Sequence, residues 1–367
     1  MRGHIEKRGK SWSIVIELPR DPKTGKRRQK WATVKGTKKE AEARLAQLLV
    51  ELGQGCKLFD AQNLTVAQYL EKWLEGIKPT TRPNTFASCQ RAAKKYSELL
   101  GDIPLAKLTG LHIQQAVNSE SAKGDLAPST IKLHLTKFRV ALNQAVDWDI
   151  LPKTPARRIR CPECEKPKIE FWEESEAHLF LAAAEKYRYF SLFWFGLHTG
   201  MRIGELLGLT WEDVDLDSGL VYVRRTATQF GVNPPKSVAS RREVPLDAKT
   251  VKVIRKHRQH MMEEALGRGQ GWTEGTYVFL TRTGRRVTNM ETKKSFQSAI
   301  KRAGVKRITP HGMRHTFATS LLHRGVNPSE VAAILGHADV ATLMNTYAHA
   351  LPSDRKAALE AIGKAFG

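Results

Sequence analysis

The sequence lacks the features that would place it in a membrane or outside the cell. No uninterrupted apolar run approaches the roughly 18 residues that a membrane-spanning helix needs. The first ten residues are polar and charged, which is not the pattern of a signal peptide. Only four cysteines occur in 367 residues, too few for a disulfide scaffold. We therefore expect a cytoplasmic protein without membrane contact.

Motifs for metals and nucleotides are also scarce. Cys161 and Cys164 form half of a zinc-ribbon pattern, but a closed zinc site needs four ligands and no second pair follows. His311 and His315 have the spacing of a zinc-binding pair, yet its glutamate is missing and Arg314 would repel the metal. No G-x-x-x-x-G-K-[ST] loop for ATP and no convincing acidic triad occur. We expect no cofactor and no metal.

Acidic residues are outnumbered by basic ones. The chain has 60 Lys and Arg against 37 Asp and Glu, a formal charge of +23. A positive excess of this size attracts polyanions, and nucleic acid is the partner that it most favours. A basic protein with nothing bound is the alternative. Hydrophobic residues make up 41%, which is enough for globular cores and too much for general disorder.

Residues 1–57 form a small basic block, with fifteen Lys or Arg against six Asp or Glu. Strand-forming residues at 12–18 and 27–34 flank a turn, and Thr37 to Glu40 has the capping-box pattern that begins a helix. We expect a short sheet with a packed helix that contacts DNA. A minor structural domain with a solvated charged face is the alternative.

Residues 62–151 predict an all-helical domain, because apolar residues recur at helical spacing in four segments. The fourth segment begins at Pro128, and its apolar stripe is expected to face the core. That stripe consists of Ile131, Leu135, Phe138, Leu142 and Ala145. Lys132, Lys137 and Arg139 lie off the stripe, where they could meet phosphate.

A basic linker is expected at 152–170. Four prolines and six Lys or Arg fall within 152–168, against two acidic residues. This composition predicts an extended segment, suited to joining two domains that clamp a duplex.

Residues 171–367 predict a mixed, mainly helical domain with a small antiparallel sheet. We expect helix over 179–197, strands over 214–225 and 243–246, and helices from Asn289 onward. The fold class is therefore multidomain α+β: a small sheet-plus-helix domain, an all-helical domain and this mixed domain.

Six side chains in this last block suit phosphate chemistry. They are Arg202, Lys236, His311, Arg314, His337 and Tyr347. Two arginines can grip non-bridging oxygens, a histidine can move a proton, and a lysine can protonate a leaving oxygen. A tyrosine with an ordinary pKa near 10 needs positive neighbours to attack as a phenolate. Taken singly, each residue has an ordinary explanation as a surface ion pair or as packing; together they predict a metal-free phosphodiester site.

The turn before Arg202 adds to this prediction. Gly200 permits a tight turn, so Arg202 should lie at a helix start and project away from the core. Glu205 would then hold its guanidinium.

The sequences around these residues resemble the catalytic boxes of the tyrosine recombinase (phage integrase) family. The matching stretches are Thr-Gly-Met-Arg-Ile-Gly-Glu at 199–205, His-Gly-Met-Arg-His at 311–315, and Leu-Gly-His at 335–337 followed by Tyr347. The order of the three blocks resembles lambda-type and conjugative-transposon integrases, in which the first block binds arm-type DNA sites and the second binds core sites.

This resemblance implies a role for each residue. Tyr347 would attack the scissile phosphate, form a 3′-phosphotyrosine and free a 5′-hydroxyl. Arg202 and Arg314 would bind the phosphate. Lys236 would protonate the leaving oxygen, His311 would transfer protons and His337 would orient the phosphate. Met313 departs from the commoner leucine only slightly. Arg241 and Arg242, farther along the same hairpin, are the alternatives to Lys236 in this match.

The resemblance also implies partners and competing functions. The partners are double-stranded DNA with core and arm sites, a homotetramer assembled on it, and accessory bending and excision factors. Leu359, Ile362 and Phe366 in the tail would dock on a neighbouring protomer or pack on their own domain. The leading function is integration or excision of a phage or other mobile element in a bacterial cell. A Xer-like resolvase, a type IB topoisomerase and a non-catalytic DNA-binding regulator are the alternatives.

Overall fold

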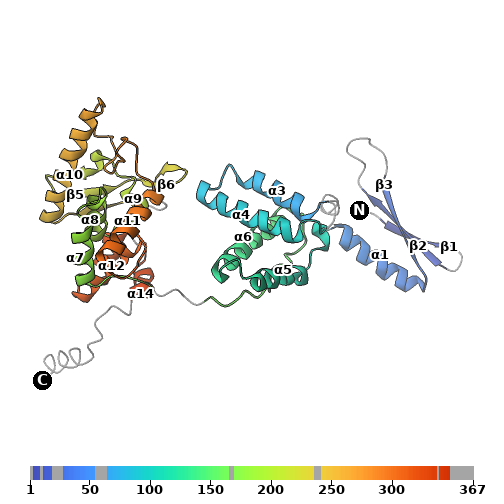
Figure 1. Cartoon of the computed structure of the whole chain (residues 1–367). Helices are drawn as coiled ribbons and strands as arrows, with labels where there is room; N and C mark the ends of the chain where they lie inside the picture. Colours follow the sequence, from blue (N-terminus) through green and yellow to red (C-terminus); the bar gives the residue numbers. More distant parts are fainter. Residues whose placement is uncertain are drawn as a thin grey trace, which may run out of the picture. The chain divides into compact units, whose positions relative to one another are not determined.

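The computed structural model describes residues 3–8, 11–18, 28–53, 64–164, 169–234, 241–336 and 339–347. The chain divides into two compact units, Met1–Glu165 and Lys166–Gly367, called here the N-terminal and C-terminal units (Figure 1). The expected fold class, a multidomain α+β chain with a helical middle part, is confirmed. In the described ranges, no helix combines the length and apolar character of a membrane span.

The N-terminal unit begins with a three-stranded antiparallel sheet covered by one helix. Its elements are β1 (Gly3–Arg8), β2 (Ser11–Leu18), β3 (Arg28–Val34) and α1 (Lys38–Gly53). The two expected strands correspond to β2 and β3, and β1 was not expected. Ile14 and Ile16 are buried beneath α1, where Leu45 packs against them. The expected capping box is present: the Thr37 amide donates to the Glu40 carboxylate over 2.9 Å.

Four helices make the second part of this unit. They are α3 (Val66–Ile77), α4 (Pro83–Leu100), α5 (Gly110–Lys123) and α6 (Pro128–Asp147), with a short 3₁₀ turn at Leu105–Lys107. Proline occupies the first turn of α4 and α6, where its missing N–H costs nothing. All five residues of the expected apolar stripe on α6 are buried. Tyr96 of α4 stacks on Phe138 of α6, with 4.0 Å between ring centroids.

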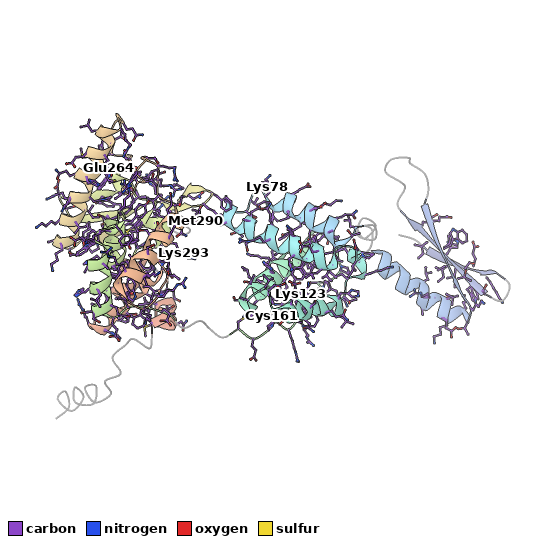
Figure 2. The ribbon with its side chains drawn as sticks, in the orientation of Figure 1. Lys78, Lys123, Cys161, Glu264, Met290 and Lys293 are labelled. Carbon is purple, nitrogen blue, oxygen red and sulfur yellow. The ribbon has the colours of Figure 1, made fainter. Side chains whose placement is uncertain are left out.

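The first half of the expected linker packs on these helices. Ala156 and Ile159 are buried in the same hydrophobic core, and Cys161 packs at its edge (Figure 2). Arg139 of α6 donates hydrogen bonds to the carbonyls of Ala156 and Ile159, over 3.2 and 2.8 Å. Arg139 was expected to be available to phosphate, but its guanidinium fastens the linker instead. The apolar residues between the prolines explain why 152–161 lies on the helical part.

The C-terminal unit is built around the buried helix α8 (Phe190–Thr199), whose Leu192, Phe193 and Phe195 have no exposed surface. The expected helix over 179–197 is interrupted, because α7 (Glu174–Ala184) ends before α8 begins. Arg188 lies in the break. It donates to both carboxylate oxygens of Glu264, over 2.7 and 2.6 Å, and to the Leu280 carbonyl, and these bonds fix the connecting segment outside a helix.

A small antiparallel sheet and a hairpin cover one side of this core. The sheet has the order β4 (Val214–Asp215), β5 (Leu220–Val223) and β8 (Arg242–Pro245). The expected strand over 214–225 is interrupted at Gly219, whose φ of 66° makes a turn. The hairpin β6 (Thr226–Thr228) and β7 (Gly231–Asn233) was not expected.

Helices complete the unit. They are α9 (Ile203–Leu206), α10 (Ala248–Gly267), α11 (Asn289–Ala303), α12 (Gly312–His323), α13 (Pro328–Leu335) and α14 (Val340–Tyr347), with a 3₁₀ turn at Trp211–Asp213. The last three form a second small core that includes Leu322, Leu335 and Tyr347. The α12 helix also packs on α8, so it joins the two cores.

Candidate active site

Arg202 is positioned by the turn that follows α8. Gly200 has a φ of 60°, and a Cβ at this position would lie 2.4 Å from Cδ1 of Phe317. Only glycine fits this crowded left-handed position. Arg202 then caps α9, and its Nη1 donates to Glu205 Oε1 over 2.9 Å. The expected arrangement of Gly200, Arg202 and Glu205 is therefore confirmed, and the Arg202 side chain keeps 38% of its surface exposed.

Arg314 is the most deeply buried cation of the unit's described part, with 2% of its surface exposed. Its Nη1 donates to the Gly200 carbonyl over 3.0 Å, and its Nη2 donates to the Leu335 carbonyl over 2.8 Å. Burial, and then the charge of Arg202, lower the pKa of Arg314, but a guanidinium stays protonated at neutral pH. A permanent positive charge is thus held between the turn before Arg202 and the end of α13.

Arg242 connects the sheet to α9 and to the end of α13. Its guanidinium binds both oxygens of Glu205, with Nη2 at 2.9 Å from Oε2, and its Nε donates to the Ile334 carbonyl over 2.5 Å. The Arg242 side chain is 6% exposed. Arg242 was one alternative to Lys236 as the acid of the hairpin. The guanidinium is bonded to these buried partners, which favours a positioning role for Arg242.

Glu205 is a buried carboxylate between two guanidiniums, with 3% of its surface exposed. Burial by itself raises the pKa of Glu205, but the hydrogen bonds and charge of Arg242, together with Arg202, outweigh it, so the pKa is lowered. Glu205 therefore stays ionised at neutral pH and fixes the direction of Arg202.

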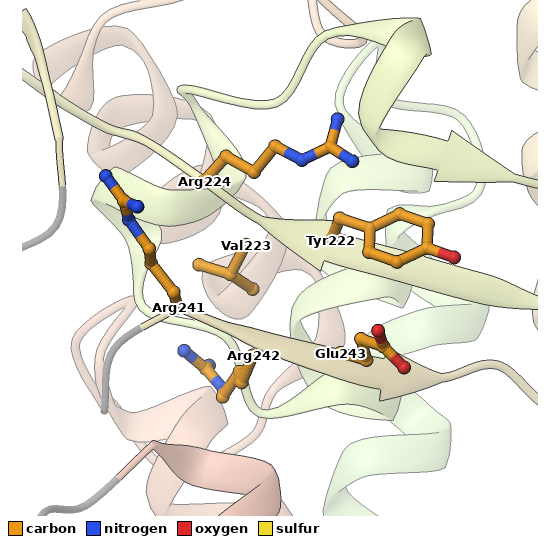
Figure 3. A pocket seen from close by; sticks show the side chains of 6 residues that line it. All are labelled: Tyr222, Val223, Arg224, Arg241, Arg242 and Glu243. Atoms are coloured by element: carbon orange, nitrogen blue, oxygen red, sulfur yellow. The ribbon is translucent and has the colours of Figure 1, made fainter. Parts of the chain in front are cut away.

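Arg241 directly precedes β8, which begins at Arg242. Figure 3 shows both in the lining of a surface cavity of about 470 Å³, together with Arg224. Arg241 is exposed, in contrast to Arg242. The arginines of this cavity add cationic surface next to β5 and β8.

Tyr347 ends α14 with its ring buried, 1% exposed. Its hydroxyl lies 2.6 Å from Nδ1 of His315, on α12. Burial raises the pKa of Tyr347 to about 12, while the charges of Arg314 and Arg202 act in the opposite direction. The two arginines are thus close enough to stabilise a phenolate at this position.

His311 caps the start of α12, and its ring meets that of His315 edge-on, with 4.8 Å between centroids. His311 as a whole residue is exposed at the surface. Its pKa is nevertheless lowered, first by desolvation of the ring and then by the charges of Arg314 and Arg202. A neutral imidazole beside two guanidiniums can accept a proton or donate a hydrogen bond at neutral pH.

Four of the six expected residues therefore meet at one place: Arg202, His311, Arg314 and Tyr347. Lys236 and His337 lie outside the described residues.

Sequence reasoning missed the contacts of Arg242 and His315. The available signal for Arg242 was its place on a strand in which alternate residues face the core. His315 was considered only as a zinc ligand, and the described residues hold no group of three or more His, Cys, Asp or Glu placed to bind a metal.

Comparisons with known proteins match three successive parts of the chain to domains of integrases. The model of the phage integrase family matches residues 170–354, that of its N-terminal SAM-like domain matches 65–121, and an arm DNA-binding domain matches 4–52. A relative named tyrosine recombinase XerC-like, from Caldanaerobacter subterraneus, is 30% identical over 356 residues and covers 90% of each chain.

Two solved structures share the fold. The integrase of transposon Tn1549, in complex with transposon right end DNA, has a TM-score of 0.70 at 22% identity, covering 82% of this chain and 100% of that one. A lambda integrase tetramer bound to a Holliday junction has a TM-score of 0.61 at 16% identity, covering 91% and 95%.

Proposed function

We propose that this chain, which belongs to the phage integrase family of tyrosine recombinases, cuts and rejoins DNA through a covalent bond to Tyr347. The observation that carries this proposal is the buried Tyr347 hydroxyl within the field of Arg314 and Arg202. A phenol in such a place has the two things that phosphoryl transfer needs: a nucleophile and fixed positive charge for the phosphate.

The proposed cleavage step is a direct displacement at phosphorus. Oη of Tyr347 bonds to the phosphorus, the bond from phosphorus to the 5′ oxygen breaks, and a 3′-phosphotyrosine remains. Arg202 and Arg314 bind the non-bridging oxygens, since guanidinium N–H groups match phosphate geometry. The 5′-hydroxyl of another strand then reverses the step, so the energy of the bond is kept in the phosphotyrosine.

Two further roles rest on the sequence resemblance. Lys236 protonates the leaving 5′ oxygen, and His337 hydrogen-bonds to the phosphate. Support for His337 comes from its neighbours, because Arg242 and Arg314 hold the carbonyls of Ile334 and Leu335 just before it. His311, next to both arginines, hydrogen-bonds to the phosphate or transfers a proton.

The domains divide the work on DNA. We infer an arm-binding domain at 1–57, a helical core-binding domain at 62–151, a basic linker at 152–170 and a catalytic domain at 171–367. The three family matches and the charge of +23 support this division. Raised salt should weaken binding steeply, because phosphate contacts release counterions.

The relatives support a proposal for the assembly and the setting of this chain. A lambda integrase forms a tetramer on a Holliday junction, and a transposon integrase binds the transposon end. We infer a homotetramer on double-stranded DNA that integrates or excises a mobile element in the bacterial cytoplasm, with bending and excision factors as helpers and the chain's tail as a contact between protomers.

A chromosome-dimer resolvase is the second candidate, because one relative carries a XerC-like name. The match of residues 4–52 to an arm DNA-binding domain favours an integrase.

A nicked suicide substrate tests the proposed function. The nick lies close to the scissile phosphate of a candidate attachment site, so that the cleaved strand diffuses away and the covalent product accumulates. We expect a 3′ adduct that survives denaturation and is absent in Tyr347→Phe. An adduct that persists in that variant would contradict the assignment of the nucleophile.

Lys236 has a separate test. A 5′-phosphorothiolate leaving group needs no proton, so it should restore cleavage by Lys236→Ala. Absence of rescue would point to Arg241 or to another donor.

A further inference from the structure

His315 contacts the atom that would react. It follows Arg314 on α12, and its Nδ1 lies 2.6 Å from Oη of Tyr347, within the range of a strong hydrogen bond. The two rings are 5.5 Å apart between centroids, and the His315 side chain is half-buried. This contact joins α12 to α14 at the hydroxyl itself.

The hydroxyl must lose its proton when its oxygen bonds to phosphorus. Burial in the core of α12, α13 and α14 makes this loss harder, since the pKa of Tyr347 is raised to about 12. Arg314 and Arg202 stabilise the phenolate but carry no site that can accept a proton. A base in contact with the hydroxyl removes this obstacle.

We propose that His315 is a catalytic residue, the base that takes the proton of Tyr347 during cleavage and returns it during rejoining. This inference rests on the proposed function. In cleavage, the proton of Oη moves to Nδ1 of His315 as the bond from Oη to phosphorus forms. The electron pair of the breaking bond goes to the 5′ oxygen, which takes a proton from Lys236. Rejoining runs the same transfers backwards.

The geometry favours His315 over His311 for this role. Among the described residues, no hydrogen bond joins His311 to Tyr347, and the His311 ring lies roughly perpendicular to the His315 ring. His311 instead lies in the field of Arg314 and Arg202, with Glu205 acting in the opposite direction. His311 is therefore placed for the phosphate and His315 for the nucleophile.

The experiment measures the single-turnover rate of adduct formation on the nicked substrate as a function of pH. The proteins are the full-length wild type, His315→Ala, His315→Gln and Tyr347→Phe. His323→Ala is the matched control, because His323 is an exposed histidine on the same helix. DNA binding by each variant, measured by gel shift, verifies that it is folded.

We expect His315→Ala and His315→Gln to bind DNA normally and to lose cleavage by about 10²- to 10⁴-fold, the usual contribution of a general base. The wild-type rate should rise between about pH 5 and 8, where histidines titrate, and then level off. In the two variants, the rate should keep rising above that range. His323→Ala should match the wild type.

A fluorinated tyrosine at position 347 provides a second test. It should not restore the cleavage rate if His315 had only a structural role. Because its phenol is more acidic, it depends less on a base, so it should recover part of the rate lost in His315→Ala. No recovery would overturn the proposal. Full activity of His315→Gln with the wild-type pH profile would also overturn it, since glutamine keeps a hydrogen bond but accepts no proton.

The same experiment distinguishes failure of the inference about His315 from failure of the proposed function. If the wild type forms an adduct that needs Tyr347 and His315→Ala forms it equally fast, only the role of His315 is lost. If the wild type forms no adduct that depends on Tyr347, both proposals fail together.

Discussion

Glu205 in the C-terminal unit and Glu120 in the N-terminal unit are both buried carboxylates that contact two cations. Glu205 is 3% exposed and binds Arg202 and Arg242, whereas Glu120 is 4% exposed and binds Lys95 and Lys123. The two lysines keep 27% and 49% of their side-chain surface exposed, but Arg242 keeps only 6%. The two glutamate carboxylates are thus neutralised in different ways.

The difference lies in what each cation can fix. A guanidinium is planar with a rigid fork of donors, so Arg242 holds both oxygens of Glu205 and also the Ile334 carbonyl. An ammonium is a hydrated point charge on a flexible stem, so Lys95 and Lys123 compensate the charge of Glu120 without linking further elements. The arginine arrangement positions a site, and the lysine arrangement stabilises the packing of α4 against α5.

The same substitution at the two glutamates gives the largest expected contrast. Glu205→Gln removes the charge that directs Arg202, and we expect the cleavage rate on the nicked substrate to fall by about 10²-fold, as when one charge-stabilising donor is lost. Glu120→Gln should leave that rate within about twofold, because Glu120 contacts no residue of the proposed site.

Glu205→Gln leaves the buried Arg242 without its charged partner and should lower the stability of its unit by about 3–5 kcal/mol. Glu120→Gln leaves two lysines that reach water, so its cost should be smaller, about 1 kcal/mol. Hydrogen exchange of α9 and of α5 measures the two effects separately. Equal losses of cleavage in the two variants, at matched folded fractions, would refute the distinction.

Exchanging the cations gives a smaller contrast. Arg242→Lys keeps the charge but cannot reach Glu205 and the Ile334 carbonyl together, so we expect a loss of cleavage of about tenfold. Lys123→Arg keeps the contact with Glu120 and should change neither cleavage nor stability measurably. Single-turnover assays at saturating DNA provide the comparison, and a fully active Arg242→Lys would show that charge alone suffices.

The smallest expected effect is on acid stability. The pKa of Glu205 and that of Glu120 are both lowered: in each, burial acts upward but is outweighed by the hydrogen bonds of Arg242 and of Lys95, respectively. A depressed folded-state pKa contributes stability that is present above the ordinary glutamate pKa near 4.3 and is lost as pH falls through the folded-state value.

Urea denaturation between pH 7 and pH 3 tests this dependence. The stability difference between the wild type and each Gln variant should shrink as the pH falls. A difference that stays constant down to pH 3 would mean that neither carboxylate titrates with folding.

Much of the fold could be predicted from periodicity. The stripe of α6 and the capping box of α1 depend on neighbours within one turn of helix, and both were found as expected. By contrast, β1 has no strong strand pattern of its own, because its sequence is largely polar and its pairing with β2 decides its structure. The break between α7 and α8 depends on Arg188 reaching Glu264, 76 residues later, which no local pattern contains.

The site shows the same division. Arg202 and Glu205 are three residues apart, so their contact could be expected from the helix start alone. The contact of His315 with Tyr347 spans 32 residues, and that of Arg242 with Ile334 spans 92. Such contacts follow from tertiary packing, and the resemblance to a family did not reveal them.

The grip of Arg242 and Arg314 on the carbonyls of Ile334 and Leu335 also bears on how the protein is made. A nascent chain emerges from the ribosome with its N-terminus first. Arg202, Arg242 and Arg314 therefore appear before the end of α13 that satisfies two of them. Until Ile334 and Leu335 have emerged, Arg242 and Arg314 lack these backbone partners, and Tyr347 follows later still. All of the contacts that hold the proposed site can therefore be present only once synthesis has passed Tyr347.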